Sequence, residues 1–288
     1  MSTQLEEAEQ AGGSTHRAVT LTPQASRLLE GPVLPTLLRL AAPTVALMLL
    51  QGVVAAGEAA FVGRLGSDAL AGVSLSFPLV MLMTTLSAGA YGGGVASGVA
   101  RALGAGKDDD ATRLAGTALG MSAILGLAST AAMMLSGPAF YAAFGATGPA
   151  LEAAVLYSDV LFLGAVPSWL FNAAASVLRG GGNTAYPAAA GAAGGVVTLA
   201  ASPLVIFGAG PVPGLGVAGA AWAVVGYNVA MSVVLLRAVW ASGSPTRPDF
   251  RSLVPRWSYA SGILRVAVPS AASTVLTNLT FIILTALV

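Results

Sequence analysis

Seven long apolar runs divide this 288-residue chain and limit its fold more than any other feature. They cover residues 34–62, 69–100, 114–136, 153–178, 187–208, 216–241 and 263–288. One bilayer crossing needs about 20 apolar residues, and only 9% of this chain is charged against 56% hydrophobic. Lipid offers no partner for exposed backbone groups, and the runs are too long for barrel strands, so each is expected to be a helix. The sequence predicts an all-α integral membrane protein with seven spans.

The last apolar run repeats the start of the first. Residues 38–62 and 264–288 both open with Leu-Arg and place a proline at the same offset, so that Pro43 matches Pro269. Internal repeats of this kind are typical of transporters whose halves rock about a central site. The second copy stops in mid-helix, so we expect a truncated chain that holds one lobe and the first helix of another.

The expected organisation has four parts. Residues 1–30 are polar and are expected to form a disordered cytoplasmic tail, which contains the only histidine, His16, interpreted as solvated. This tail lacks the apolar core and cleavage site of a signal peptide. Residues 31–241 are expected to form the N-terminal lobe with helices 1–6. Residues 242–262, which contain three prolines, are the expected cytoplasmic loop between lobes, and residues 263–288 the expected helix 7.

Basic residues concentrate on one side of the predicted spans. With the N-terminus in the cytoplasm, only Arg64 among the 13 Lys and Arg residues falls on the outer side. This asymmetry predicts a multi-pass protein of the cell inner (plasma) membrane with a cytoplasmic N-terminus. A net charge of +1 gives no sign of nucleic-acid binding, and the absence of cysteine excludes disulfides and Cys-ligated metal. The aspartates 108–110 are interpreted as a solvated helix start, so neither a metal nor a cofactor is predicted.

Two carboxylates lie inside the predicted spans. A charge in the bilayer core is costly and marks a functional site. Glu58 lies in the first span between small and apolar residues, and Asp159 lies near the outer end of the fourth. Glu58 is interpreted either as an interfacial residue that reaches the headgroups or as a carboxyl that exchanges a proton near physiological pH. Asp159 is the weaker candidate of the two for ion coupling, because a loop close by would keep it wet.

Polar uncharged residues on the fourth and fifth spans are candidates for lining a cavity. They are Tyr157, Asn172, Thr198 and Ser202. Thr198 and Ser202 are four residues apart and therefore share a helix face. Each hydroxyl could equally bond back to the carbonyl four residues earlier, in which case it has no further role.

Four segments resemble the multidrug and toxic compound extrusion (MATE) transporters. They are FVGRLGSDALAGV at residues 61–73, LRGGGNT at 178–184 followed by Pro187, SPLVIFG at 202–208, and GVAGAA at 216–221. Each is weakly specific alone, but together they occur in the family's order over about residues 31–288. The resemblance implies the six-helix N-terminal lobe of a twelve-helix, two-lobed, cation-coupled exporter, plus helix 7.

The resemblance also assigns roles to residues. Glu58 stands where the family usually has a first-helix aspartate, and Tyr157 matches a fourth-helix tyrosine near the cation site of some members. Where many members carry Asn and then Asp before a proline, this chain has Thr198 and Ser202. One of the two carboxylates often used for coupling is therefore missing. In the second copy of the repeat, Leu284 aligns with Glu58, so the first helix of the second lobe lacks an ionisable group there.

These features predict a proton-coupled antiporter that exports amphipathic or cationic small molecules, such as drugs, by alternating access. H⁺ is favoured over Na⁺, because a single carboxylate with neutral oxygens would hold sodium weakly. A flippase for lipid-linked sugars would be expected to carry several intramembrane Arg or Lys residues, and this chain has none in the middle of its spans. A membrane enzyme would need clustered His or carboxylates, and it is not predicted. A structural membrane protein is disfavoured by the repeat and by Glu58. The expected partners are a small-molecule substrate, the coupling ion H⁺ or Na⁺, the lipid bilayer and the missing C-terminal lobe.

Overall fold

The structure is a computed structural model that describes residues 33–209, 212–241, 244 and 246–286. The predicted tail, residues 1–30, lies outside the described residues. The chain divides into two compact units at Met48. The first unit contributes the described residues 33–48, and the second unit, Leu49–Val288, contains every site discussed below.

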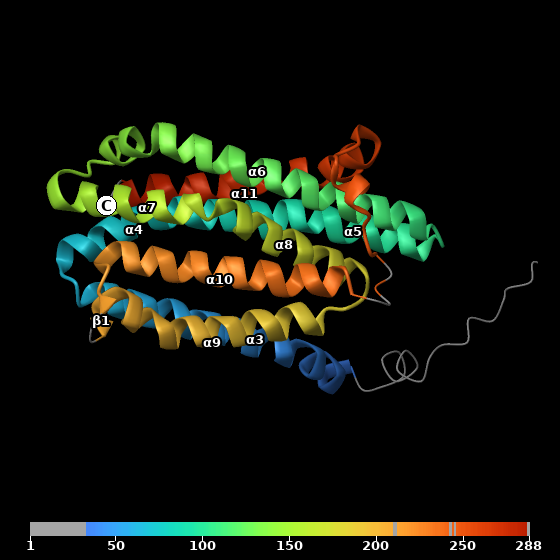
Figure 1. Ribbon diagram of the computed structural model, residues 1–288, viewed down its shortest axis with the longest axis horizontal. Coiled ribbons are helices and arrows are strands. Elements are labelled where there is room, and N and C mark those ends of the chain that lie inside the picture. The colour runs from blue at the N-terminus through green and yellow to red at the C-terminus, as the bar shows by residue number, and fades with distance from the viewer. Residues whose placement is uncertain (1–32, 210–211, 242–243, 245, 287–288) are drawn as a thin grey trace, which may run out of the picture. The chain divides into compact units, whose positions relative to one another are not determined.

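The second unit is built almost entirely of helices (Figure 1). The elements are α3 (Val33–Gly63), which begins in the first unit, α4 (Ser67–Thr84), the π-helix η1 (Thr85–Tyr91), α5 (Gly92–Gly104), α6 (Asp108–Ala143), α7 (Gly148–Leu163), α8 (Ala165–Gly180), α9 (Ala185–Phe207), β1 (Gly208–Ala209), β2 (Val212–Pro213), α10 (Gly216–Val239), the 3₁₀-helix η2 (Phe250–Leu253) and α11 (Trp257–Ala286).

The all-helical membrane fold is confirmed. In the described residues, five helical stretches are long and apolar enough to cross a membrane, and the pair α7–α8, bent by 50°, makes a sixth. The part of α3 in the second unit, Leu49–Gly63, is a shorter apolar helix. Each of the seven predicted spans therefore coincides with a helix or with a bent pair of helices.

The predicted helix start at the aspartates 108–110 is confirmed, because α6 begins at Asp108. Other predicted boundaries need correction. Helix α6 continues through Pro138 to Ala143, although Gly137 and Pro138 predict a loop there. Helix α11 begins at Trp257 and not at residue 263, because the polar end of a long helix extends beyond the apolar core of the bilayer. The predicted outer loop after α9 contains a short antiparallel hairpin, in which Gly208 pairs with Pro213.

Two spans are interrupted in ways that the apolar pattern does not reveal. The second contains the π-helix η1 between α4 and α5, and the fourth breaks at Gly164 between α7 and α8. π-Helical turns inside α-helices are rare and occur frequently at functional sites. Both interruptions lie inside stretches that are long and apolar enough overall to cross a membrane, so hydropathy does not reveal them.

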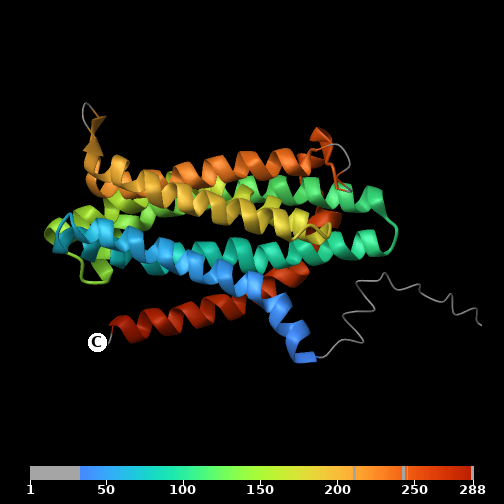
Figure 2. The ribbon, with the colours of Figure 1, turned by 90° about the horizontal axis from the view of Figure 1, so that it is seen from below.

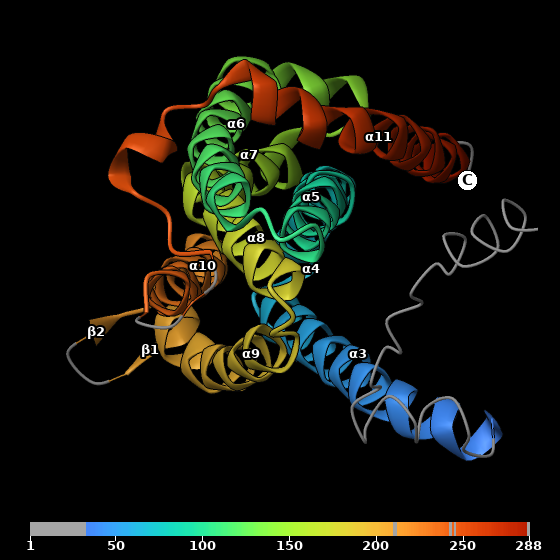
Figure 3. The same ribbon diagram turned by 90° about the vertical axis from the view of Figure 1, so that its right-hand side faces the viewer.

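Helix α8 is the central element of the bundle. It packs against α5, α6 and α10, and the end-on view shows these three helices around it (Figure 3). Ten of its 16 residues are buried, and many of these are Ala or Ser. Small side chains let membrane helices approach closely. Helix α11 packs on η1 and α5 near its start and diverges from the bundle toward its C-terminal end (Figure 2).

Close approach of α4 and α7 depends on one glycine. A Cβ atom on Gly72 would lie 2.6 Å from the Cβ of Ala153 and 2.8 Å from the carbonyl oxygen of Ala150. Any larger residue would push the two helices apart, since interiors are packed without spare space. This contact fixes the position of α7, which carries Tyr157.

Candidate functional site

A cavity of about 360 Å³ lies between α3, α9 and α10, with one residue from the end of α4, and we call it the Glu58 cavity. Its lining is mainly small and apolar. The lining residues are Leu50, Gln51, Val54, Ala55, Glu58, Thr84, Gly191, Ala192, Gly195, Thr198, Val224 and Tyr227. Glu58 is the only charged side chain among them.

The Glu58 carboxylate has no basic partner. Within the part of the chain that the structure describes, it makes neither an ion pair nor a hydrogen bond, and its side chain is partly buried. A carboxylate in an apolar environment is costly unless it is paired, protonated or bound to a cation. The geometry therefore leaves this group free to exchange a proton or to meet a cationic ligand.

Tyr157 on α7, which packs against α4, α6 and α10, lies close to Glu58. Its hydroxyl interacts electrostatically with the Glu58 carboxylate and with the hydroxyl of Tyr141. Tyr141 comes from the end of α6, is fully buried, and its hydroxyl has no hydrogen-bond partner in the described chain. Two tyrosine hydroxyls thus extend the polar site away from the cavity and toward α6.

Ser202 approaches the same region from α9. It is 1% exposed, and its hydroxyl has no hydrogen-bond partner among the described residues. Ser202 shares a helix face with Ile206, and Glu58 shares a face with Val62, because each pair is four residues apart. Ile206 and Val62 belong to one buried cluster, and Tyr157 packs against that cluster. The faces that carry Glu58, Ser202 and Tyr157 therefore converge.

Thr198 lies one turn before Ser202 and lines the Glu58 cavity. Its hydroxyl donates to the carbonyl oxygen of Gly194 at 2.9 Å. This bond within the helix already satisfies the hydroxyl proton. Thr198 contributes an oxygen lone pair and a methyl group to the wall and leaves no free donor.

Of the predicted residues, only Glu58 and Thr198 line the Glu58 cavity, and Asp159 and Asn172 also lack the link to Glu58 that Tyr157 and Ser202 have. Asp159 is two residues after Tyr157 on α7, so it points to a different face of the helix, and it is not among the described lining residues. The amide of Asn172 donates to Ser87 in the π-helix at 2.9 Å. Asn172 thus joins α8 to η1. On α8, the Ser176 hydroxyl donates to the backbone carbonyl of Asn172 and accepts a hydrogen bond from Arg179.

Sequence reasoning missed three polar residues near Glu58. Gly137 and Pro138 predict the end of the third span and so place Tyr141 in a loop, whereas the helix continues past them. Gln51 and Tyr227 are polar groups in the middle of apolar runs, and that position was the available signal. In the described residues, no group of three or more His, Cys, Asp or Glu side chains could hold a metal ion.

Together the fold and the site define an integral membrane protein with a lone carboxylate between its first, fifth and sixth spans. Residues 43–204, more than half of the chain, match the model of the MatE family. The chain belongs to this family, the MATE transporters. This match confirms the resemblance noted in the sequence. The family consists of transporters and not of enzymes.

Known relatives agree with this placement. The chain is 36% identical to the probable multidrug resistance protein NorM of Deinococcus radiodurans over 66% of its length and 42% of that protein. It is 29% identical to an FAD transporter of Shewanella oneidensis over 67% of its length and 43% of that protein. The chain thus spans less than half of the length of these two relatives.

Solved structures share the fold. An inward-facing multidrug resistance MATE family transporter of the MOP superfamily aligns with a TM-score of 0.75 at 29% identity, over 82% of this chain and 53% of that one. A MOP superfamily transporter from Pyrococcus furiosus, described as having a binding pocket of reverse polarity, aligns with a TM-score of 0.76 at 29% identity, over 88% and 56%. The chain therefore matches about half of the MATE fold.

Proposed function

We propose that this chain supplies the N-terminal lobe of a proton-coupled antiporter that exports amphipathic or cationic small molecules by alternating access. A second lobe completes the transporter. The observation that carries the proposal is the unpaired Glu58 carboxylate in an otherwise uncharged cavity. Residues 31–241 form the coupling lobe, and α11 begins the second.

Coupling follows from competition for one carboxylate. When Glu58 is ionised, it attracts a cationic substrate, because a charge in a poorly solvated site needs a counter-charge. When Glu58 is protonated, that attraction is lost and the substrate leaves. The nearby hydroxyls of Tyr157, Tyr141 and Ser202 provide a route for the proton. A single carboxylate with a few neutral oxygens favours H⁺ over Na⁺.

The shape of the lobe fits an amphipathic substrate. A second cavity of about 550 Å³ lies between α9 and α10 and shares Thr198 and Tyr227 with the Glu58 cavity. Its lining is mostly apolar and includes Trp222 and Met231. A substrate can therefore place its cation at Glu58 and its apolar body along α9 and α10.

The FAD transporter among the relatives raises a second substrate class. FAD carries a pyrophosphate, which basic side chains would have to balance. No Lys or Arg is among the described residues that line either cavity. The charge of this lobe therefore favours cations over nucleotide-like anions.

The test uses the full-length protein reconstituted in liposomes. An imposed pH gradient drives uptake of a fluorescent cationic dye by the wild type, and Glu58→Gln abolishes the gradient-dependent part. Glu152→Gln is the matched control, since Glu152 is an exposed carboxyl on α7 outside both cavities. Gradient-driven uptake that survives in Glu58→Gln would rule out coupling through this carboxyl.

We also propose a cytoplasmic N-terminus in the inner membrane, because basic residues gather at one end of the bundle. The chain has no cysteine, so single cysteines report sidedness directly. In intact cells, a membrane-impermeant maleimide should label Phe144→Cys and spare Lys107→Cys. The reverse pattern would invert the topology.

A further inference from the structure

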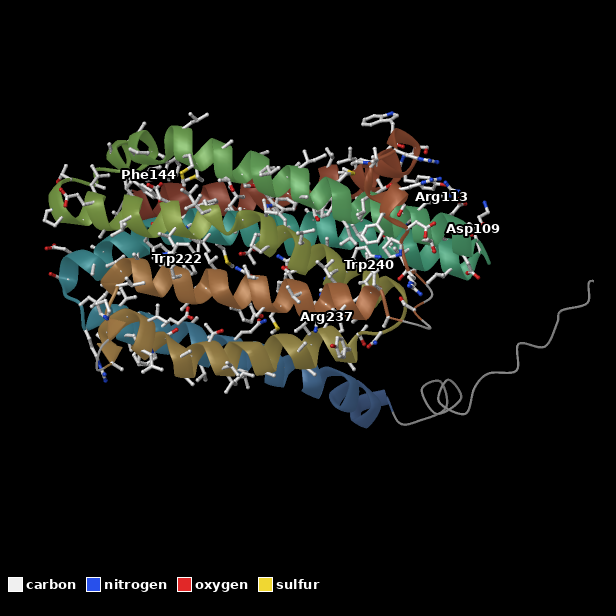
Figure 4. The ribbon with its side chains drawn as sticks, viewed as in Figure 1. Asp109, Arg113, Phe144, Trp222, Arg237 and Trp240 are labelled. Carbon is white, nitrogen blue, oxygen red and sulfur yellow. The ribbon has the colours of Figure 1, made fainter. Side chains whose placement is uncertain are left out.

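A polar pocket lies at the basic end of the bundle, far in sequence from the residues of the Glu58 cavity. It has a volume of about 300 Å³ and lies between the first turns of α6 and the segment that joins α10 to α11. We call it the linker pocket. It is lined by Asp109, Thr112, Arg113, Thr117, Asp249, Arg251, Ser252 and Arg256. Figure 4 shows Asp109 and Arg113 at this end, opposite Phe144.

The joining segment is held tightly against α6. A Cβ atom on Gly116 would lie 1.9 Å from the Oγ of Ser252, and one on Gly120 would lie 1.8 Å from the carbonyl oxygen of Leu253. Two glycines one turn apart therefore make a groove in α6 that seats η2. Because both walls belong to packed elements, the pocket is part of the fold.

Aromatic contacts fix the same segment to α10. The indole N–H of Trp240 donates to the carbonyl oxygen of Pro248 at 2.8 Å, and its ring stacks on Phe250 with centroids 6.2 Å apart. On the other side, the hydroxyl of Tyr259 donates to Asp110 at 3.0 Å. The segment is thus anchored before and after the residues that line the pocket.

The pocket contains three guanidinium groups without partners. Within the described chain, Arg113, Arg251 and Arg256 make no ion pair and no hydrogen bond. Arg113 and Arg256 both interact electrostatically with Tyr259, so they lie near each other. The carboxylates of Asp109 and Asp249 oppose these charges, which leaves the lining with one positive charge in excess.

A hydroxyl that faces the pocket marks the inner wall. The Thr117 side chain is 1% exposed and lines the pocket, and its hydroxyl makes no hydrogen bond to the described residues. It is not one of the enclosed hydroxyls without a partner, which are those of Tyr141 and Ser202, so it is accessible from the pocket. A donor that faces a pocket with three guanidinium groups matches an anionic ligand with several acceptor oxygens.

We infer that the linker pocket binds a phosphate group. Phosphate offers acceptor oxygens to the forked N–H donors of arginine, a pairing that is both charge-assisted and geometrically specific. The hydroxyls of Thr117 and Thr112 supply further donors. The group can come from an anionic lipid headgroup at the membrane surface or from a soluble phosphate. This site is independent of the proposed proton coupling.

Binding is measured on the full-length protein, purified in detergent and stripped of lipid. Native mass spectrometry follows the uptake of dioleoyl-phosphatidylglycerol, and isothermal titration follows inorganic phosphate. The double variant Arg113→Gln/Arg256→Gln should weaken binding by about tenfold or more, since each loses charge-assisted hydrogen bonds. Arg101→Gln is the matched control, because Arg101 is an exposed arginine in the last turn of α5 outside the pocket.

A variant that is expected to strengthen binding keeps the test independent of folding defects, because a misfolded protein would only bind less. Asp249→Asn removes an opposing carboxylate and should strengthen binding. A loss confined to phosphatidylglycerol assigns the pocket to a lipid headgroup, and a loss confined to inorganic phosphate assigns it to a soluble ligand. Both outcomes support the site. Equal affinities in the wild type and the double variant for both probes, or weaker binding in Asp249→Asn, would overturn it.

Discussion

The Glu58 cavity and the linker pocket differ in how many charged groups they contain. Among its described lining residues, the cavity has one charged side chain, Glu58, in a wall of mainly small and apolar residues. The linker pocket has five charged groups within a smaller volume, none of which forms an ion pair in the described structure. One site lies between membrane-spanning helices, and the other lies at their wet, basic end.

The contrast follows from the solvent around each site. A charge between membrane helices costs several kcal/mol or is neutralised, so a site there keeps as few charges as its task needs. At the end of the bundle water screens each charge, so several can coexist at low cost. Substitution should therefore act as an all-or-none change at Glu58 and as a graded change in the linker pocket.

The largest structural effect should come from Gly120→Ala, which should impair the linker pocket and leave the Glu58 cavity intact. The new methyl group would collide with the backbone of Leu253 and push η2 off α6. Overpacking of this kind costs about 1–3 kcal/mol. We expect a lower midpoint of thermal unfolding and loss of phosphate binding, with binding of the cationic dye retained.

Gly93→Ala is the control for that substitution. Gly93 is also in a helix, and a Cβ atom there would meet nothing within 4 Å. Alanine favours helix over glycine by up to about 1 kcal/mol, so this variant should be neutral or slightly stabilised. Intact phosphate binding in Gly120→Ala would show that the position of η2 does not build the pocket.

Most of the fold could be predicted from the sequence. Apolar runs identify membrane spans because the bilayer sets both their length and their composition. The breaks could not be predicted in this way. The π-helix η1 and the kink at Gly164 lie inside spans whose overall hydropathy is high on both sides of the break, and packing against neighbouring helices decides the backbone geometry there. The anchoring of η2 likewise depends on glycines of α6 that are distant in sequence.

The candidate site could be predicted in part. Glu58 is conspicuous because charges are rare in spans, and the structure places Tyr157 and Ser202 toward it. Asn172 has an equally conspicuous position, but it bonds to Ser87 on another helix. A polar residue in a span shows that a partner exists without showing which one. The sequence does not indicate the linker pocket, because its arginines also follow the rule that basic residues gather on one side of a membrane protein.

The smallest effect on transport should come from Thr198→Val. Ser202→Ala, one helical turn further along α9, is the variant to compare it with. The Thr198 hydroxyl bonds within its own helix, so valine removes a bond that contributes little, and transport should change by less than about twofold. Ser202 has a buried hydroxyl without a partner, so alanine should leave stability unchanged or raise it by up to about 1–3 kcal/mol. If that hydroxyl passes protons to Glu58, gradient-driven dye uptake should fall in Ser202→Ala although the protein is no less stable. Equal uptake in both variants would remove Ser202 from the proton route and leave the tyrosines as its only members.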